Sequence, residues 1–220
     1  MMNLNLGRKS AEPRIILCLG AHSDDIEIGC GGTLLQLRMS GAKLRFHWVV
    51  FSAEGVRLQE AREAADSFTS GSELRFVVKD YRDGFFPYVG AQIKEYFEEL
   101  KGQVDPDIIF THWQGDAHQD HRLISELTWS TFRNHFIFEY EIPKFDGDMG
   151  RPNAFIPLEE SAYRNKTEKL CEVFESQRSK RWFERETFQG LMRLRGMESN
   201  APSGHAEAFY VRKFLIDPAS

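Results

Sequence analysis

The chain has 220 residues, of which 41% are hydrophobic and 28% charged, with 28 Lys and Arg against 33 Asp and Glu. This length fits one domain that buries roughly 70% of the surface its unfolded chain exposes. The net charge of -5 argues against a protein that mainly coats nucleic acid, the 18 Phe argue against a disordered chain, and three Cys without a C-x-x-C pair argue against a disulfide framework or a zinc knuckle.

The predicted elements alternate between strands and helices. In chain order they are a buried strand at 14–19, a helix at 33–40, a strand at 44–51, a helix at 55–68, a strand at 74–78, a helix around 93–100, a strand at 107–111, a helix at 123–132, a strand at 135–142, a charged helical region at 163–188 and a final strand at 206–216. The stretch 143–157 carries three Pro and two Gly and predicts an ordered loop.

This alternation is typical of βαβ units. We therefore expect an α/β, Rossmann-like fold with a mostly parallel sheet and helices on both faces. A single domain is expected over residues 1–220, with 143–220 forming a C-terminal extension over the site.

No transmembrane span is expected. The longest apolar run, Ile15 to Ala21, is about a third of the ~20 residues that a membrane crossing needs. The start of the chain, Met1 to Arg14, lacks a signal-peptide pattern, so a cytoplasmic enzyme is predicted.

Two polar clusters follow predicted strands, where parallel α/β sheets bind their ligands. The first is Ala21-His-Ser-Asp-Asp-Ile-Glu-Ile-Gly-Cys-Gly-Gly32, and the second is His112-Trp-Gln-Gly-Asp-Ala-His-Gln-Asp-His121. In the first, His22 and Asp25 can turn toward one ion and leave Asp24 free. In the second, His118 and His121 have the same spacing, with Asp120 between them.

Imidazole and carboxylate ligands without a thiolate suit a catalytic zinc site, which uses three protein ligands and keeps one position for water. A spare carboxylate beside the metal is where a general base belongs. Each cluster alone could be an Asp-rich helix cap, but capping explains two such clusters on neighbouring loops poorly.

These motifs resemble those of the PIG-L/LmbE family of metal-dependent N-deacetylases. That family has an Ala-His-Pro-Asp-Asp-x-Glu-x-Gly-x-Gly-Gly-like run and a later His-Pro-Asp-His, with both prolines replaced here, by Ser23 and Gln119. The resemblance extends to weaker matches at Arg57-x-x-Glu60, Asp83-Gly84, Ser176-Gln177 and Ala206-Glu-Ala-Phe209.

The resemblance implies roles for individual residues. It makes His22, Asp25 and His121 the zinc ligands and Asp24 the general base. It makes His118 the acid or electrostatic partner of the reaction and Asp120 the carboxylate that orients it. Arg57 is expected at the reaction centre or the substrate, and we add His205, before the last strand, as a second substrate contact.

The predicted function is zinc-dependent removal of an acetyl group from an N-acetylated sugar conjugate, a small molecule of the N-acetylglucosamine type. Fe²⁺ is the alternative metal, because two His and one carboxylate also describe a non-haem iron site. A non-catalytic sugar- or nucleotide-binding module is the other alternative. A homo-oligomer is left open, and the basic run Arg178 to Arg185 is either a solvated helix face or a phosphate contact.

Overall fold

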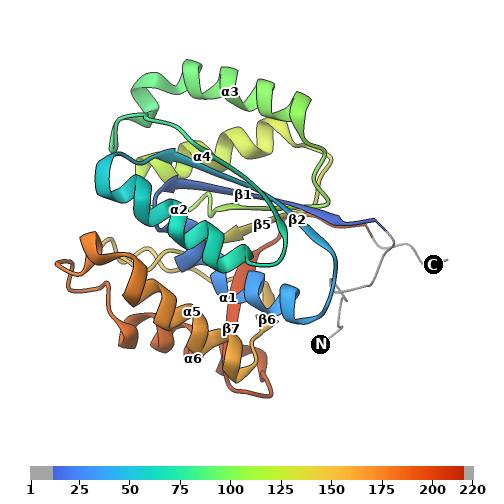
Figure 1. The fold of residues 1–220 in the computed structure, drawn as a ribbon, viewed down its shortest axis with the longest axis vertical. Coiled ribbons are helices and arrows are strands. Elements are labelled where there is room, and N and C mark those ends of the chain that lie inside the picture. Colours follow the sequence, from blue (N-terminus) through green and yellow to red (C-terminus); the bar gives the residue numbers. More distant parts are fainter. Residues whose placement is uncertain (1–11, 216–220) are drawn as a thin grey trace.

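A computed structural model describes residues 12–215 of the chain. Within them, seven strands form one sheet in the order β3-β2-β1-β4-β5-β7-β6. Figure 1 shows this sheet between two layers of helices. The strands are β1 Arg14–His22, β2 Leu44–Ser52, β3 Glu73–Val78, β4 Ile108–His112, β5 Ile137–Tyr140, β6 Ala154–Pro157 and β7 Ala206–Tyr210. The first five strands pair in parallel, whereas β7 is antiparallel to both β5 and β6.

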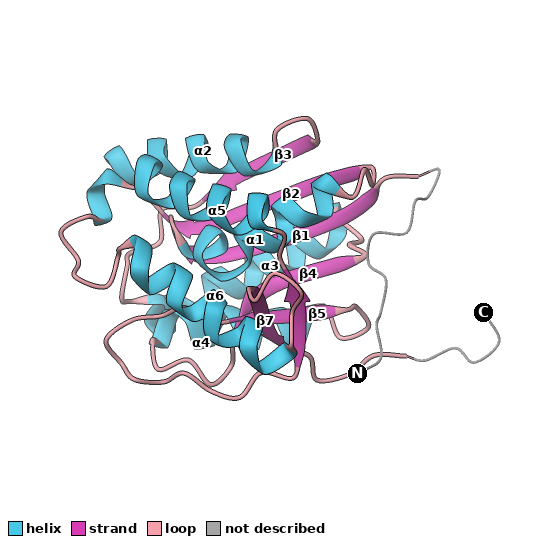
Figure 2. Cartoon of the chain, turned by 90° about the horizontal axis from the view of Figure 1, so that it is seen from below, coloured by secondary structure: helices cyan, strands magenta, loops and turns pink. Residues whose placement is uncertain are grey.

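Helices cover both faces of this sheet (Figure 2). They are α1 Asp25–Met39, α2 Gly55–Thr69, α3 Gly90–Gln103, α4 Gln119–Thr131, α5 Glu160–Val173 and α6 Arg185–Ser199, with short 3₁₀ turns η1 Phe86–Val89 and η2 Glu175–Gln177. Alternate residues of β1 separate the two cores: Leu17 and Leu19 pack with α3 and α4, and Ile16 and Cys18 pack with α1, α2, α5 and α6. The predicted fold class, with a mostly parallel sheet and helices on both faces, is confirmed.

Several predicted boundaries were wrong. The start of the first helix matters for function, because the helix includes Asp25. The first helix begins at Asp25, eight residues before the predicted start, because the Gly-rich run continues the helix. The predicted helical region 163–188 is divided into α5, η2 and α6, and residues 178–184 form a loop. The stretch 143–157 contains the short strand β6, and the final strand ends at Tyr210, while Ile216 lies outside the described residues.

Glycines let α1 pack closely against its neighbours. A Cβ at Gly29 would overlap the ring of Tyr140, and one at Gly31 would lie 2.6 Å from the ring of Phe68. Tyr140 is held in place because its hydroxyl donates to the carbonyl of Leu19, 2.7 Å away. These two glycines therefore bring the helix that carries Asp25 against the sheet.

A buried ion pair from the C-terminal part of the chain also holds α1. The Lys166 ammonium lies 2.5 Å from Glu207 and donates to the carbonyl of Ile28. The Glu207 carboxylate in turn accepts the backbone N–H groups of Gly32 and Thr33, at 2.8 and 2.6 Å. Elements α5 and β7 are thus connected directly to the interior of α1.

Among residues 12–215, no helix has the length and apolar character required to cross a membrane.

Candidate metal centre

The two polar clusters meet at the carboxyl edge of the parallel strands, on the left in Figure 1. His22 is the last residue of β1, and Asp25 is the first residue of α1. His121 lies in the first turn of α4, which follows the neighbouring strand β4. The fold therefore brings together side chains that are about a hundred positions apart in the chain.

Three donor groups converge closely enough to share one ion. The Nδ1 atom of His22 lies 3.2 Å from Nε2 of His121 and 3.3 Å from Oδ2 of Asp25. The Nε2 atom of His121 lies 3.5 Å from the other Asp25 oxygen, and the three donor atoms fall within 4.8 Å of one another. The carboxylate of Asp25 is oriented by the backbone N–H of His22, at 2.6 Å.

Both histidines have a carboxylate on the ring nitrogen that faces away from this centre. The Nδ1 atom of His121 lies 2.9 Å from Asp116, and the Nε2 atom of His22 lies 3.1 Å from Asp83 and 3.3 Å from Asp120. Metal-binding histidines carry such partners, which fix the tautomer and the ring orientation. The donor set therefore fits a divalent metal ion.

Two other groups of His and Asp come within the same range. They are His22, Asp83, His118 and Asp120 on one side, and His112, Asp116 and His121 on the other. Both fit a cation less well, since the Asp120 carboxylate already accepts two backbone N–H groups and the Lys144 ammonium lies 3.0 Å from Asp116.

The electrostatics of the three-residue centre favour a positive charge. Burial lowers the pKa of His22, but Asp25, Asp120 and Asp83 outweigh it and raise this pKa well above its ordinary value. Burial, and then the neighbouring His112, lower the pKa of His121 to about 4, so this ring is neutral and able to ligate.

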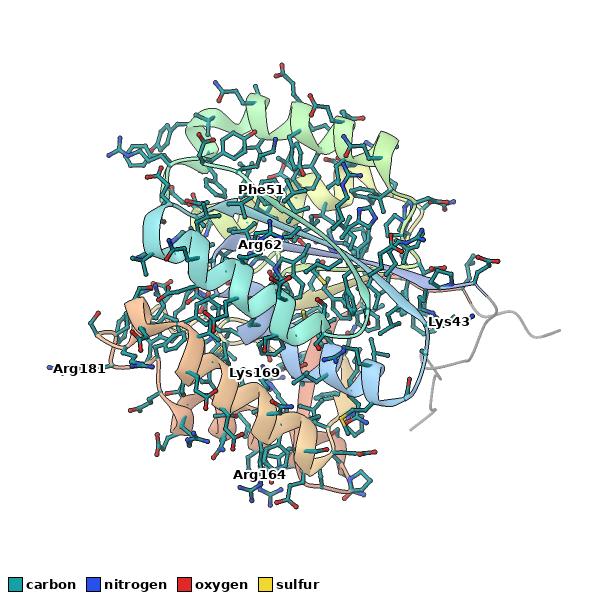
Figure 3. The ribbon with its side chains drawn as sticks, viewed as in Figure 1. Lys43, Phe51, Arg62, Arg164, Lys169 and Arg181 are labelled. Atoms are coloured by element: carbon teal, nitrogen blue, oxygen red, sulfur yellow. The ribbon has the colours of Figure 1, made fainter. Side chains whose placement is uncertain are left out.

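Asp24 is buried beside this centre and is only 6% exposed. It occupies the N-cap position of α1, yet its side chain makes no capping hydrogen bond. Burial and the nearby Asp25 raise its pKa to about 6, while the positive charge of Lys180, from the loop after α5, lowers it. In the same loop, Arg181 extends outward from the protein (Figure 3).

The structure brings His118 and Asp120 together beside this centre. The His118 ring packs on His121 at a centroid distance of 4.5 Å, and its Nδ1 accepts the backbone N–H of Asp120. The Asp120 carboxylate has an oxygen within 4.8 Å of a ring nitrogen of His118, but no hydrogen bond joins the two side chains. It accepts the N–H groups of Gly84 and Phe86, at 2.6 and 3.1 Å, and faces His22.

The two predicted substrate contacts lie in different surroundings. Arg57, in the first turn of α2, lies 3.4 Å from Asp83, which itself contacts His22. The ring of His205 stacks on Tyr163 at a centroid distance of 3.8 Å, and its Nδ1 lies 3.2 Å from the carbonyl oxygen of Ser203. None of the contacts found for His205 among residues 12–215 joins it to the centre.

Sequence reasoning gave no role to Asp83 or Asp116, and it named His112 only as the first residue of the second cluster. Asp83 belongs to the Asp83-Gly84 match and Asp116 to the second cluster, so both were visible in the sequence. His112 is fully buried, with its Nε2 3.2 Å from Asp25. Lys144 had no signal beyond its position in the loop 143–157.

Comparison with known proteins is consistent with this geometry. Residues 17–132 match the model of the family described as PIG-L: GlcNAc-PI de-N-acetylase. An Escherichia coli K12 protein, named uncharacterized deacetylase YaiS, is 27% identical over 138 residues, which cover 58% of this chain and 74% of that protein.

Solved structures share the fold over most of both chains. The conserved protein TT1542 from Thermus thermophilus has a TM-score of 0.69 at 19% identity, covering 93% of this chain and 98% of its own. The N,N'-diacetylchitobiose deacetylase from Pyrococcus horikoshii has a TM-score of 0.62 at 19% identity, covering 95% of this chain and 88% of its own. The 4-carboxy-2-hydroxymuconate hydratase GalB from Pseudomonas putida KT2440 has a TM-score of 0.70 at 16% identity, covering 94% of this chain and 99% of its own. Since GalB is named as a hydratase, the fold alone does not select the reaction.

Proposed function

Because the chain belongs to the PIG-L family of de-N-acetylases, we propose that it is a metal-dependent hydrolase that removes the acetyl group from an N-acetylated sugar or sugar conjugate, releasing acetate and a free amine. The observation that carries this proposal is the convergence of His22, Asp25 and His121 beside the buried Asp24. The deacetylase names of YaiS and of the chitobiose enzyme support the same reaction.

Zinc is the metal that we propose for this centre. Two imidazoles and one carboxylate without a thiolate are typical of catalytic zinc, which keeps a position open for water. When bound, zinc would lower the pKa of that water and polarise the acetyl carbonyl. Ferrous iron accepts the same ligands, but an iron oxygenase has no evident use for the carboxylate of Asp24.

Asp24 is the proposed general base. An acid with a pKa of about 6 is mostly ionised at neutral pH, yet it is basic enough to accept a proton from the attacking water. Its side chain makes no capping hydrogen bond to α1 that would compete with this task. The proton that it accepts can then pass to the departing amine.

His118 is the proposed electrostatic partner. Burial lowers the pKa of His118, and the positive charge of His22 lowers it further, which favours a neutral ring. Since Nδ1 accepts the N–H of Asp120, the proton of that neutral ring resides on Nε2. An Nε2–H group can donate to the oxyanion that develops on the acetyl carbonyl.

Other parts of the prediction extend this proposal. Arg57 lies beside Asp83 and is proposed to contact the substrate, and His205 stays a prediction as a second contact. The C-terminal extension 143–220 over the site, the cytoplasmic location and a homo-oligomeric state also stay predictions.

Acetate release from a panel of N-acetylhexosamine compounds, either free or linked to nucleotide, lipid or natural-product groups, tests the proposal. The zinc-loaded protein is expected to release acetate from at least one compound, and Asp24→Asn is expected to lower kcat about 10²–10⁴-fold with metal content unchanged. Equal activity of wild type and Asp24→Asn would contradict the mechanism. Turnover that requires O₂ would favour the iron enzyme, and tight binding without turnover and insensitive to chelators would favour a binding module.

A further inference from the structure

Lys144 lies in the loop that follows β5, and its side chain is only 10% exposed. Its ammonium nitrogen lies 3.0 Å from Oδ1 of Asp116 and 2.5 Å from Oδ2 of Asp148. An ammonium group this buried requires paired carboxylates, because its desolvation is otherwise costly. Lys144 is therefore fixed between two acidic side chains.

Asp116 connects Lys144 to a proposed metal ligand. While Oδ1 contacts Lys144 and accepts the backbone N–H of His118 at 2.7 Å, Oδ2 lies 2.9 Å from Nδ1 of His121. Asp148 contacts the same turn from the other side, since it accepts the N–H of Ala117 at 2.6 Å. The Lys144–Asp148 pair thus contacts the turn 116–118 at two points.

The loop that carries Lys144 is itself anchored. Arg195 of α6 makes two hydrogen bonds to the carboxylate of Glu141, at 2.7 and 2.9 Å, and another to the carbonyl of Gly150, at 3.2 Å. Lys144, Glu141 and Arg195 all lie beyond residue 132, where the family match ends. The ion pair of Lys144 with Asp116 is therefore made by a part of the chain that the family match does not cover.

We propose that Lys144 is a positioning residue for the metal centre: it holds Asp116 in the orientation in which the other carboxylate oxygen fixes the ring of His121. With Nδ1 of His121 bound to Asp116, the Nε2 lone pair faces Asp25 and His22. This inference rests on the metal site of the proposed function, and it adds a residue from outside the ligand motifs.

The direction in which the zinc Kd changes when Lys144 is replaced distinguishes a positioning role from an effect of its charge alone. Lys144 is a cation near a site for a cation, so its charge alone opposes metal binding. If only charge matters, replacing Lys144 with a neutral residue strengthens zinc binding. If Lys144 positions Asp116, the same replacement weakens zinc binding, by about 10-fold on the scale of other outer-partner mutations.

The experiment measures the zinc Kd by competition with a chromophoric chelator, in the absence of substrate, for wild type, Lys144→Met and Lys144→Arg. Lys144→Met is expected to weaken binding about 10-fold, and Lys144→Arg to restore most of the loss. Lys94→Met is the matched control, because Lys94 also pairs with a carboxylate four residues later, Glu98, but on α3. Its Kd is expected to equal that of wild type.

Two additional readouts complete the test. The visible absorption of the Co²⁺-loaded protein is expected to change in Lys144→Met and to stay unchanged in Lys94→Met, which a general loss of stability does not produce. If Lys144→Met does not fold, Lys144→Gln, which is also neutral but keeps a polar end at this buried place, is expected to weaken zinc binding in the same direction.

An unchanged or tighter zinc Kd in Lys144→Met, or in Lys144→Gln when that variant replaces it, would overturn the inference and leave the proposed function standing. Failure of the wild-type protein to bind zinc, iron or another divalent metal would instead overturn the proposed function. The two failures are therefore distinguishable.

Discussion

The Nδ1 atom of His22 faces the Nε2 atom of His121 across 3.2 Å, and the Asp25 carboxylate lies beside both. Two imidazole nitrogens this close need a proton or a metal ion between them, because their lone pairs otherwise repel. The acidic neighbours raise the pKa of His22 well above its ordinary value, so the metal-free centre keeps a proton at neutral pH. In the metal-free protein, that proton supplies the positive charge that the metal ion would supply when bound.

Metal loading is therefore expected to release about one proton per zinc at pH 7, since a ligand nitrogen must be deprotonated. Titration calorimetry in buffers that differ in ionisation enthalpy measures this number. A binding enthalpy that does not depend on the buffer would contradict the assignment of the proton. In His22→Ala, zinc binding is expected to weaken and the buffer dependence to disappear.

The pH dependence of kcat/KM is expected to show an acidic limb at or below about pH 6. A base must be ionised to act, so activity falls as the pH drops through the pKa of Asp24, which burial raises to about 6, and a bound metal ion can only lower that pKa further. The positive charge of Lys180 lowers this pKa. Lys180→Gln is therefore expected to move the limb to higher pH.

Arg181→Gln is the control for that shift. It removes the same formal charge one residue later, from a side chain that is exposed and extends outward from the protein (Figure 3). Its limb is expected to coincide with that of wild type. Equal shifts in the two variants would mean that the effect reflects net charge and not the position of Lys180.

Asp120→Ala is expected to destabilise the metal-free protein by about 2–4 kcal/mol, because two backbone N–H groups lose their buried acceptor. These are the N–H groups of Gly84 and Phe86. Asp120→Asn keeps one acceptor oxygen and is expected to cost less. Denaturant unfolding measures both variants, and Asp105→Ala, which changes a 98%-exposed carboxylate, is expected to have little effect.

Gly29→Ala is expected to destabilise the protein by about 1–3 kcal/mol, the cost of overpacking a dense core. The added methyl group would overlap the ring of Tyr140. Gly190→Ala is the matched control, because Gly190 lies inside α6 and an added Cβ meets nothing within 4 Å. That change is expected to stabilise the protein by about 0.5–1 kcal/mol, and a similar loss in both variants would contradict the packing argument.

The parallel part of the fold was predictable, because short apolar runs such as Arg14–Leu19 and amphipathic stretches alternate regularly along the first 140 residues. The C-terminal part of the fold was less predictable from the sequence. Strands β6 and β7 have four and five residues, and the direction of β7 is determined by its pairing with β5 and not by its composition.

The candidate site likewise has residues that the sequence could predict and residues that it could not. His22, Asp25 and His121 are recognisable because each lies in a short contiguous motif at the end of a strand. Asp83, which contacts His22, and Lys144, which contacts Asp116, come from other loops, 61 and 28 positions from those partners. Such pairings depend on tertiary structure, so sequence spacing could not reveal that Asp120 also faces His22.

The contact between Glu207 and the middle of α1 limits how far this protein can be shortened. A fragment that ended with the family match at residue 132 would retain every proposed metal ligand but lack Glu207 and Lys166. It would also lack β5, and it would expose the surfaces of α1 that α5 and β7 cover and the edge of β4 that pairs with β5. Residues 17–132 are therefore not a minimal enzyme, and fusions or truncations should preserve the chain at least to the end of β7.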